Sequence, residues 1–323
     1  MNRTIAQTRT GPMIVSRATL EAVLPDIDQV AAMEAAFVAY SQGRTQMAAI
    51  GELVFESPPG DAHIKSGHIA GDEVFVVKVA TGFYDNPKRG LPSSSGLVMV
   101  FDATTGEPRA ILLDEGMLTD ERTAAAGATA ARHLAPAAIE RIAILGAGVQ
   151  ARLQLRRLCS VTPCRAVRVW ARRPDAAAAL VAEAEAMGFS VQVAATPGQA
   201  TQDAQLVVTT TPSTTPLLTA ADIRPGTHIT AVGADSAHKQ ELSSDLLAKA
   251  DLIVADSLIQ CRERGELRRA PDGPRVAELG EVIAGRTAGR LSEDEITIAD
   301  LTGVAVQDIA LAKAVLARLG GPA

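Results

Sequence analysis

Aromatic residues, cysteines and long apolar runs are all scarce in this sequence. Phe, Trp and Tyr account for 3% of the 323 residues, and the three cysteines are Cys159, Cys164 and Cys261. This odd number, without CxxC spacing, suits neither a disulfide framework nor a structural zinc site. We therefore expect a reduced, cytoplasmic protein without a metal. No apolar run is long enough to span a bilayer, which indicates a soluble protein with no membrane partner.

Positive charge is not in excess either. The chain carries 31 Lys and Arg against 37 Asp and Glu, which gives a net charge of −6. A nucleic-acid partner would have no electrostatic support from this balance, so nucleic-acid binding is not expected. The apolar fraction of 47% supplies a large core. The length exceeds that of a usual single-core protein, which predicts two domains.

The first part of the chain has the pattern of a mixed α and β domain. Residues 18–43 carry apolar residues at helical spacing and are interrupted at Pro25, which predicts two short helices. Short β-rich pieces separated by turn signals follow. The expected strands are 52–55, 63–65, 73–79, 96–101 and 110–113. A long alanine-rich helix is then predicted from Thr119, taken as its N-cap, to about Leu134.

The second part of the chain alternates strands with helices. The expected strands are 141–145, 167–170, 190–193, 206–209, 228–232 and 252–255. The expected helices are 150–159, 175–187, 241–250 and 276–284, with a final helix at about 304–319. Successive βα units predict a parallel, doubly wound sheet of the Rossmann type. The fold class is therefore α/β, with a second domain of different architecture.

A glycine-rich turn lies between the first strand and helix of this βα region. Gly146 would let the chain turn sharply, and Gly148 would let the backbone approach a pyrophosphate. The small Ala151 would let the helix pack closely on the strand, and the start of that helix would face the phosphate charge. Tight turns also use glycine for conformational reasons alone. The strand before, the helix after and the repeats downstream favour a dinucleotide site.

The end of the second strand bears on the choice of cofactor. Many dinucleotide sites carry an acid there that binds the ribose hydroxyls. Here the chain reads Trp170-Ala171-Arg172-Arg173, and no acid occurs before Asp175, which resembles a helix cap. Arginines at this point suit a 2′-phosphate, so Arg172 and Arg173 favour NADP(H) slightly over NAD(H).

Four charged residues could carry chemistry. Lys78 lies on an apolar strand, where an unpaired ammonium group would be costly to bury. Either this strand is at the edge of the sheet and the lysine is solvated, or the lysine faces a polar cleft. The same two alternatives apply to Lys65. Arg122 could clamp a carboxylate or could be an ordinary surface arginine. Asp235 follows a strand and would project at the carboxyl edge of the sheet, where it could act as general acid and base or merely cap a turn.

Several of these segments together resemble the ornithine cyclodeaminase/mu-crystallin superfamily. The matching stretches are Val76–Gly82, Gly90–Pro92, Thr105–Gly106, Leu118–Ala125, Gly146–Gln150, Val232–Asp235, Lys239–Leu242 and Gly303–Asp308. They extend over nearly the whole chain. The resemblance implies a homodimer with a Rossmann domain at residues 131–302. Residues 1–130 with about 303–323 would form a substrate-binding and dimerisation domain.

The resemblance also implies the chemistry and its residues. Hydride would move between nicotinamide and the α-carbon of an amino acid, through an imine. The implied catalytic residues are Asp235, as acid and base, with Lys78 and Arg122. The implied substrate-binding residues are Arg44, Lys65, Lys78, Arg122, Asp235 and Gly303. Beside Gly146, Gly148, Arg172 and Arg173, the implied cofactor-binding residues are Ser94, Arg122, Thr123, Val149, Gln150, Thr210, Val232, Gly233, Lys239 and Thr302.

Two departures from the family pattern bear on the substrate and the cofactor. The acid of ornithine cyclodeaminases at the end of the second strand is absent, and their Asp-x-Pro-Gly-Lys stretch reads Asp235-Ser-Ala-His-Lys239 here. Both weaken the case for ornithine with NAD. We expect an enzyme of the cyclodeaminase type that acts on an amino acid. The alternatives are a ketimine or 1-pyrroline-2-carboxylate reductase, an amino-acid dehydrogenase, and a crystallin-like dinucleotide-dependent binding protein.

Overall fold

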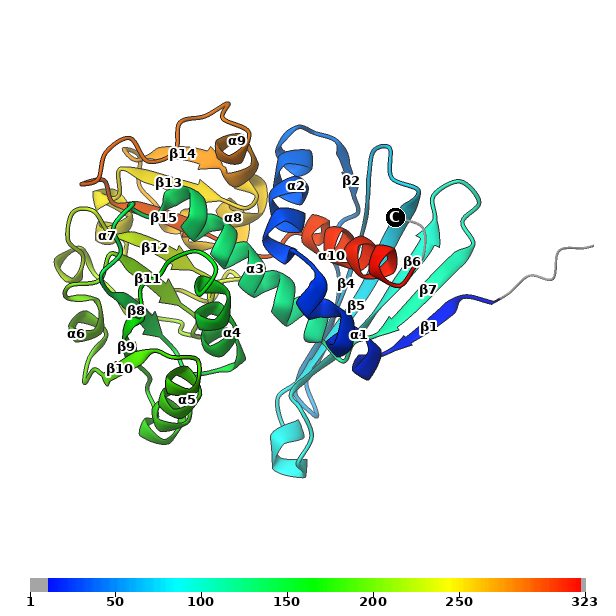
Figure 1. The fold of residues 1–323 in the computed structure, drawn as a ribbon, viewed down its shortest axis with the longest axis horizontal. Helices are drawn as coiled ribbons and strands as arrows, with labels where there is room; N and C mark the ends of the chain where they lie inside the picture. The colour runs from blue at the N-terminus through cyan, green and yellow to red at the C-terminus, as the bar shows by residue number, and fades with distance from the viewer. Residues whose placement is uncertain (1–10, 321–323) are drawn as a thin grey trace, which may run out of the picture. The chain divides into compact units, whose positions relative to one another are not determined.

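The computed structural model describes residues 11–320, and it divides into two compact units (Figure 1). The first unit comprises the chain up to Ile27, Thr45–Leu118 and the chain from Leu311. The second unit comprises Asp28–Arg44 and Thr119–Ala310. Compared with the domains expected from the sequence, the second unit starts earlier and includes a segment of the N-terminal part. Among the described residues, no helix is both long and apolar enough to cross a membrane.

The first unit is built on one seven-stranded sheet. Its strand order is β1-β7-β6-β5-β4-β2, with β3 also paired to β4. The strands are β1 (Met13–Ser16), β2 (Thr45–Met47), β3 (Gly51–Phe55), β4 (Gly60–Ile69), β5 (Val74–Phe83), β6 (Ser94–Asp102) and β7 (Pro108–Leu113). All expected strands of this region are present, most of them longer than expected. Strands β1 and β2 were not expected from the sequence; β1 pairs in parallel with β7, and β2 pairs antiparallel with β4.

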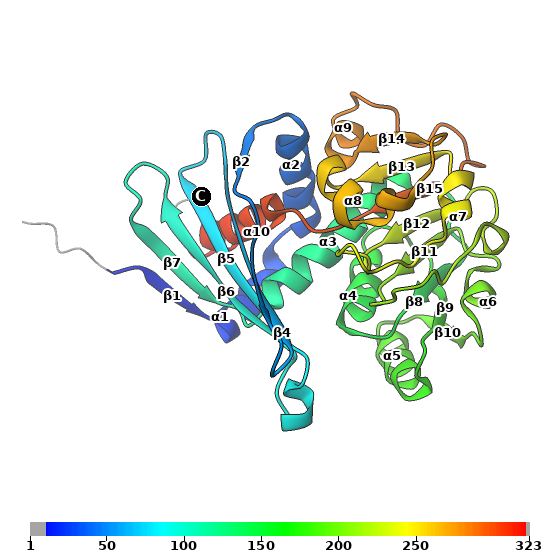
Figure 2. The ribbon, with the colours of Figure 1, turned by 180° about the vertical axis from the view of Figure 1, so that it is seen from behind.

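Alternation along the strands gives this sheet one buried face. In β5, Val74, Val76 and Lys78 point to the buried side, and in β6 Val98 and Val100 do the same. Helix α1 (Arg17–Val23) and the end of α10 (Ala305–Arg318) belong to this unit. Figures 1 and 2 show the end of α10 beside the sheet. Strand β5 lies between β4 and β6, so the possibility that Lys78 lies on an edge strand is excluded.

The second unit contains an eight-stranded sheet in which all pairs are parallel, as expected. Its order is β10-β9-β8-β11-β12-β15-β13-β14, which Figure 1 shows as one continuous stack. The strands are β8 (Ile142–Leu145), β9 (Ala166–Trp170), β10 (Ser190–Val193), β11 (Leu206–Thr209), β12 (His228–Ala231), β13 (Leu252–Ala255), β14 (Arg275–Glu278) and β15 (Thr297–Asp300). The central strands are buried along their whole length, which explains their continuous apolar sequences.

The helices that lie largely in this unit are α2 (Gln29–Ser41), α3 (Met117–Leu134), α4 (Val149–Leu158), α5 (Pro174–Ala186), α6 (Pro197–Thr201), α7 (Ser244–Lys249), α8 (Leu258–Arg264) and α9 (Leu279–Ile283). Three helix predictions need correction. Helix α3 starts before Thr119, because the Asp114 carboxylate accepts a hydrogen bond from the Leu118 N–H at 3.0 Å. The helix expected at 241–250 starts only at Ser244, and the one expected at 276–284 begins as strand β14.

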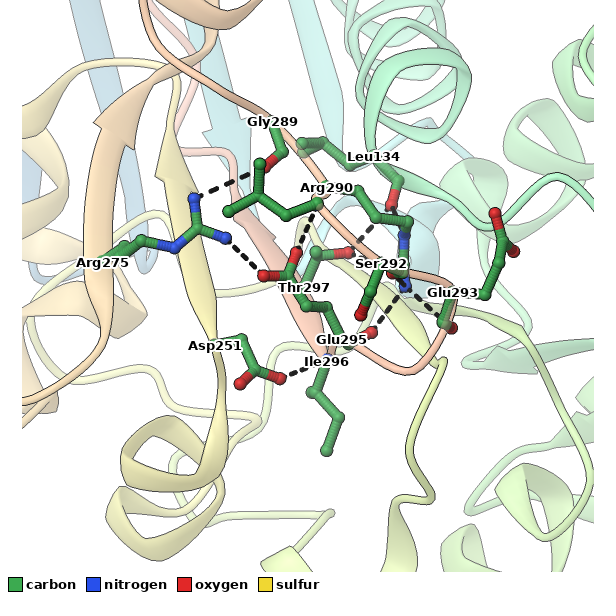
Figure 3. A network of polar contacts seen from close by, with 11 residues as sticks. Leu134, Asp251, Arg275, Gly289, Arg290, Ser292, Glu293, Glu295, Ile296 and Thr297 are labelled. Carbon is green, nitrogen blue, oxygen red and sulfur yellow. Dashed lines mark hydrogen bonds and ion pairs between the residues drawn. The ribbon is translucent and has the colours of Figure 1, made fainter.

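One arginine fixes the loop that leads into β15 (Figure 3). The Arg290 guanidinium donates to the Leu134 carbonyl oxygen at 2.8 Å, the Glu295 carbonyl oxygen at 2.6 Å and Thr297 Oγ1 at 3.0 Å. Beside it, His228 is fully buried between two threonine hydroxyls. Burial, together with the Arg290 charge, lowers the pKa of His228 to about 3. This network therefore attaches the end of α3 to the amino edge of the sheet.

Candidate functional site

The strand order of the second unit creates a switch point at β8. From β8 the chain runs through β9 to β10 on one side, and then crosses to β11 and β12 on the other. Ligands of open α/β sheets bind at such a point, outside the carboxyl ends of the strands. A pocket of about 340 Å³ lies there. It is lined by Gly146, Ala147, Gly148, Trp170, Ala171, Arg172, Arg173, Ala176, Thr210, Thr211, Pro212, Ser213 and Leu217.

The two glycines of the turn differ in what they require. Gly146 has a φ of +122°, and a Cβ there would collide with Thr210 Oγ1. Its N–H donates to the Trp170 carbonyl oxygen at 2.8 Å, which ties the turn to the end of β9. A Cβ on Gly148, the N-cap of α4, would meet no atom within 4 Å. The space beside Gly148 on the pocket side is therefore open, and a pyrophosphate would fit there at the N-terminus of α4.

The loop after β9 supplies the positive end of this pocket. Arg172 and Arg173 both line it and both are exposed. The nearest acid in sequence, Asp175, lies 3.8 Å from Arg173 and is itself exposed, so solvent weakens the pair. An anion bound in the pocket would meet two guanidinium groups at this end.

A buried carboxylate joins the ends of β11 and β12. Glu241 accepts hydrogen bonds from Thr209 Oγ1 at 2.7 Å, from the Thr211 N–H at 2.6 Å and from the Gly233 N–H at 2.8 Å. Burial raises the pKa of Glu241, while these donors act in the opposite direction. The carboxylate holds the strand ends beside Thr210 and Val232. Sequence reasoning missed Glu241, because nothing in its spacing marks a buried acid.

Asp235 lies in the loop that follows β12, at the carboxyl edge of the sheet. Its side chain is 52% exposed, and Oδ1 accepts a hydrogen bond from Lys239 Nζ at 2.7 Å. The Gln240 N–H of the same loop donates to the carbonyl oxygen of Ser213, a residue that lines the pocket. Asp235 and Lys239 are therefore brought together, on a loop attached to the pocket wall.

Arg122 is buried, which corrects the view of it as a surface arginine. Its Nη1 donates to Gln307 Oε1 at 2.9 Å, and its Nε lies 3.2 Å from Asp308 Oδ1. Gly303, with a φ of +82°, lies directly against the guanidinium, because a Cβ there would come within 2.7 Å of Nη1. Arg122 and Gly303 are therefore in direct contact. Gln307 and Asp308 fix the orientation of the arginine.

Another buried acid forms hydrogen bonds with Thr302 and Gly303. Asp256 accepts hydrogen bonds from Thr302 Oγ1 at 2.9 Å and from the Gly303 N–H at 2.7 Å. The Cys261 thiol lies 3.3 Å from Asp256 Oδ1, and burial raises the pKa of this thiol well above its usual value. Cys261 is therefore a neutral structural thiol, and Asp256 is a second residue that the sequence did not mark.

The remaining expected cofactor residues of this unit lie at the starts of α3 and α4. Val149 is exposed in the first turn of α4. The Gln150 amide donates to the Asp120 carbonyl oxygen at 3.2 Å, which connects α4 to α3. Thr123 donates its hydroxyl hydrogen to the Thr119 carbonyl oxygen at 2.8 Å.

In the first unit, Lys65 and Lys78 lie directly opposite each other in the antiparallel pair of β4 and β5. Lys78 is 3% exposed, and Lys65 is half-buried. Like charges at opposite positions destabilise a sheet unless an anion offsets them. Asp114 is such an anion: burial raises its pKa, and the Lys78 charge lowers it. Asp114 thus offsets part of the positive charge that the two lysines bring to this sheet.

Two of the expected site residues are exposed to solvent. Ser94 is exposed at the start of β6. Arg44 is exposed just after α2, where its Nε donates to Gln42 Oε1 at 2.9 Å. The expected residues are therefore divided between the units, with Lys65, Lys78 and Ser94 in the first and the others in the second.

The chain is similar to several curated proteins over nearly its whole length. It is 45% identical to an uncharacterized cyclodeaminase of Sinorhizobium fredii over 93% of both chains. It is 36% identical to the alanine dehydrogenase of Archaeoglobus fulgidus over 94% of both chains. It is also 33% identical to a Delta(1)-pyrroline-2-carboxylate reductase of Bacillus cereus, over 93% of this chain and 95% of that protein.

Solved structures give the same result. An archaeal alanine dehydrogenase, described as a dimer with bound NAD, has a TM-score of 0.86 at 34% identity and covers 95% of both chains. The Delta(1)-pyrroline-2-carboxylate reductase of Thermococcus litoralis, in complex with NADH and L-proline, has a TM-score of 0.88 at 28% identity, covering 96% of this chain and 99% of that one. The iminosuccinate reductase of Paracoccus denitrificans, in complex with NAD+, has a TM-score of 0.89 at 29% identity, covering 96% and 97%.

The sequence profile of the ornithine cyclodeaminase/mu-crystallin family matches residues 11–321, which is nearly the whole chain. The resemblance drawn from the glycine turn, the start of α3 and the Asp235 loop is thereby confirmed. This protein belongs to the ornithine cyclodeaminase/mu-crystallin family.

Proposed function

We propose that this protein is a nicotinamide-dependent enzyme that acts at the α-carbon of an amino acid through an imine. The observation that carries the proposal is the pocket at the switch point, bordered by the loop that bears Asp235. An acid at the carboxyl edge of the sheet, on a loop attached to the wall of this pocket, is placed to exchange a proton with the nitrogen of a substrate there. A crystallin-like binding protein would have no use for such a group.

In this proposal, some side chains of the site bind the substrate and others transfer a proton. When bound, NAD(P)(H) supplies or accepts the hydride. Arg122, fixed by Gln307 and Asp308, binds the substrate carboxylate. Lys65 and Lys78 are further proposed substrate-binding residues, and they belong to the first unit. Asp235 gives a proton to the substrate nitrogen or takes one from it, and Lys239 holds the Asp235 carboxylate in place. Gly303 lies against the Arg122 guanidinium, and Thr302 precedes it in the chain.

In the cyclodeaminase form of this reaction, an amino acid is oxidised to its imine and loses ammonia on ring closure. The cyclic imine is then reduced by the same hydride, so there is no net oxidation. A reductase or dehydrogenase reaction is the second candidate, because relatives with these names match over nearly the whole chain, at 36% and 33% identity. Both candidates require the same carboxylate clamp and the same acid.

For the cofactor, we infer a slight preference for NADP(H). Arg172 and Arg173 line the adenosine end of the pocket, and two guanidinium groups match a 2′-phosphate. The relatives of known structure are described with NAD or NADH. A ratio of kcat/KM for NADPH to that for NADH below one would overturn this inference.

We also propose that the protein is a homodimer of the cytoplasm. Ile14, on the edge strand β1, and Leu113, on the neighbouring strand β7, have apolar side chains exposed to solvent. A second copy would cover such a surface, and one archaeal relative is described as a dimer. The free thiols Cys159, Cys164 and Cys261 suit a reducing compartment. Light scattering of the purified protein tests the dimer.

The experiment that tests the function uses two parallel reactions. In the first, NADPH or NADH absorbance is followed with 1-pyrroline-2-carboxylate as the substrate. In the second, L-ornithine is supplied with catalytic NAD+ or NADP+, and ammonia is measured. Steady oxidation of the reduced cofactor identifies a reductase, and ammonia release without net change in the cofactor identifies a cyclodeaminase. If neither reaction proceeds, a panel of amino acids such as alanine and lysine is tested next, and silence with all of them refutes the proposal.

A further inference from the structure

The loop that bears Asp235 is held by a short segment far away in the sequence. This segment is η4 (Glu266–Arg269), a single 3₁₀ turn after α8. Arg269 donates from Nη1 to the Lys239 carbonyl oxygen at 2.9 Å and from Nη2 to the Ala237 carbonyl oxygen at 3.0 Å. Arg268 Nη1 also donates to the Ala237 carbonyl oxygen, at 2.6 Å.

The same segment holds the end of the loop. The Glu266 carboxylate accepts a hydrogen bond from the Glu241 N–H at 2.6 Å. Glu241 is the residue whose side chain joins the ends of β11 and β12. Three residues of η4 thus attach the loop at Ala237, Lys239 and Glu241, and Asp235 lies just before these attachments.

The segment η4 is in turn anchored to the central sheet. The Leu267 N–H donates to Asp300 Oδ2 at 2.8 Å, and Asp300 is the last residue of β15. In the sheet, Asp300 lies opposite Ala231, the last residue of β12. The loop that follows β12 is therefore attached, through η4, to β15, the strand that pairs with β12. Gly265 permits this close approach, because a Cβ there would collide with the Asp300 carboxylate.

The Asp235–Lys239 pair needs this support because it is exposed at its acid end. The loop itself contributes one backbone hydrogen bond to its own turn, from the Lys239 N–H to the Ser236 carbonyl oxygen at 2.9 Å. A guanidinium that bridges two carbonyl groups restrains the loop at two points with a rigid planar fork, whereas a lysine ammonium is a point charge on a flexible stem and lacks this fixed geometry.

We propose that Arg269 is a positioning residue: it holds the Ala237 and Lys239 carbonyl groups so that Lys239 keeps the Asp235 carboxylate at the site of proton transfer. The inference rests on the proposed function for the role of Asp235. The loop attachment itself can be measured without turnover.

The test compares Arg269→Ala with Arg269→Lys, and uses Arg262→Ala, at an exposed position on α8, as the matched control. Loss of two charge-assisted hydrogen bonds should lower kcat by about tenfold to hundredfold in Arg269→Ala. The Kd for NADH should stay within about twofold of wild type, because Arg269 does not line the pocket. Arg269→Lys should be intermediate, and added methylguanidinium should restore part of kcat only in Arg269→Ala.

Hydrogen–deuterium exchange gives the readout that does not depend on activity. The amides of Lys239 and Gln240 should exchange about tenfold faster in Arg269→Ala, with amides of β12 unchanged. Exchange and kcat equal to wild type would overturn the inference, as would faster exchange throughout the second unit, which would indicate a merely structural role. If the wild-type protein turns over no substrate, the proposed function fails, and the exchange comparison still decides whether Arg269 holds the loop.

Discussion

Replacing each glycine of the nucleotide turn by alanine separates a backbone requirement from a ligand requirement. At Gly146, a methyl group would collide with Thr210 Oγ1 at a φ of +122°. Backbone strain costs about 1–3 kcal/mol and overpacking adds about 1–3 kcal/mol, so Gly146→Ala should lose about 2–6 kcal/mol of unfolding free energy. At Gly148 the φ is −86° and the space is open, so Gly148→Ala should change the unfolding free energy by less than about 1 kcal/mol.

The assay combines denaturant unfolding with a fluorescence titration of NADH. Gly148→Ala should weaken NADH binding by about tenfold or more, because its methyl group enters the space proposed for the pyrophosphate. Gly188→Ala is the matched control: Gly188 has a φ of +88° in open space, so about 1–2 kcal/mol of strain is expected with unchanged NADH binding. Wild-type affinity in Gly148→Ala would refute the placement of the pyrophosphate. Wild-type stability in Gly146→Ala would refute the argument from strain.

Further predictions concern the acid, the clamp, the cofactor and the buried histidine. Asp235→Asn should lower kcat by about 10²–10⁴ without changing the Kd for NADH, and unchanged turnover would remove Asp235 from the mechanism. Arg122→Lys keeps the charge but loses the fork, so KM for carboxylate substrates should rise about tenfold; a constant KM would contradict the clamp. Replacing Arg172 and Arg173 by glutamine should reduce the kcat/KM ratio of NADPH to NADH by about tenfold or more. The pKa of His228 is lowered from 6.5 to about 3 in the folded protein. Between pH 7 and pH 5, His228 therefore stays neutral in the folded protein and takes up a proton in the unfolded chain. Stability is therefore lost as the pH falls, by about 2 kcal/mol between pH 7 and pH 5, and unfolding of His228→Gln should lack this slope.

Local signals were sufficient to predict most of the second unit. The turn from Gly146 to Gln150 identified the strand before it, the helix after it and the nucleotide pocket region, because the positive φ of Gly146 and its close approach to Thr210 demand glycine at that position. The alternation of apolar strands with helices predicted the parallel sheet. Strand β14 was mistaken for part of a helix, because four residues at the sheet border carry too little periodicity to separate the two.

The supports of the site could not be predicted, because they depend on contacts between distant segments. Glu241, Asp256 and Gln307 are acceptors for backbone and side-chain donors that lie elsewhere in the chain. Nothing local distinguishes them from surface residues of the same type. Likewise, the position of Lys78 on a central strand depends on which strands pair, and the sequence alone left an edge strand equally possible.

The place of the two arginines in the sheet order affects how such a protein can change over evolutionary time. The loop after β9 carries Arg172 and Arg173, and the loop after β12 carries Asp235; β8 and β11 separate these strands. At about 4.8 Å per strand, the loops start about 14 Å apart. Substitutions that exchange one nicotinamide pool for another can therefore accumulate without disturbing proton transfer. A lineage could thus couple the same chemistry to biosynthetic or to catabolic reducing power.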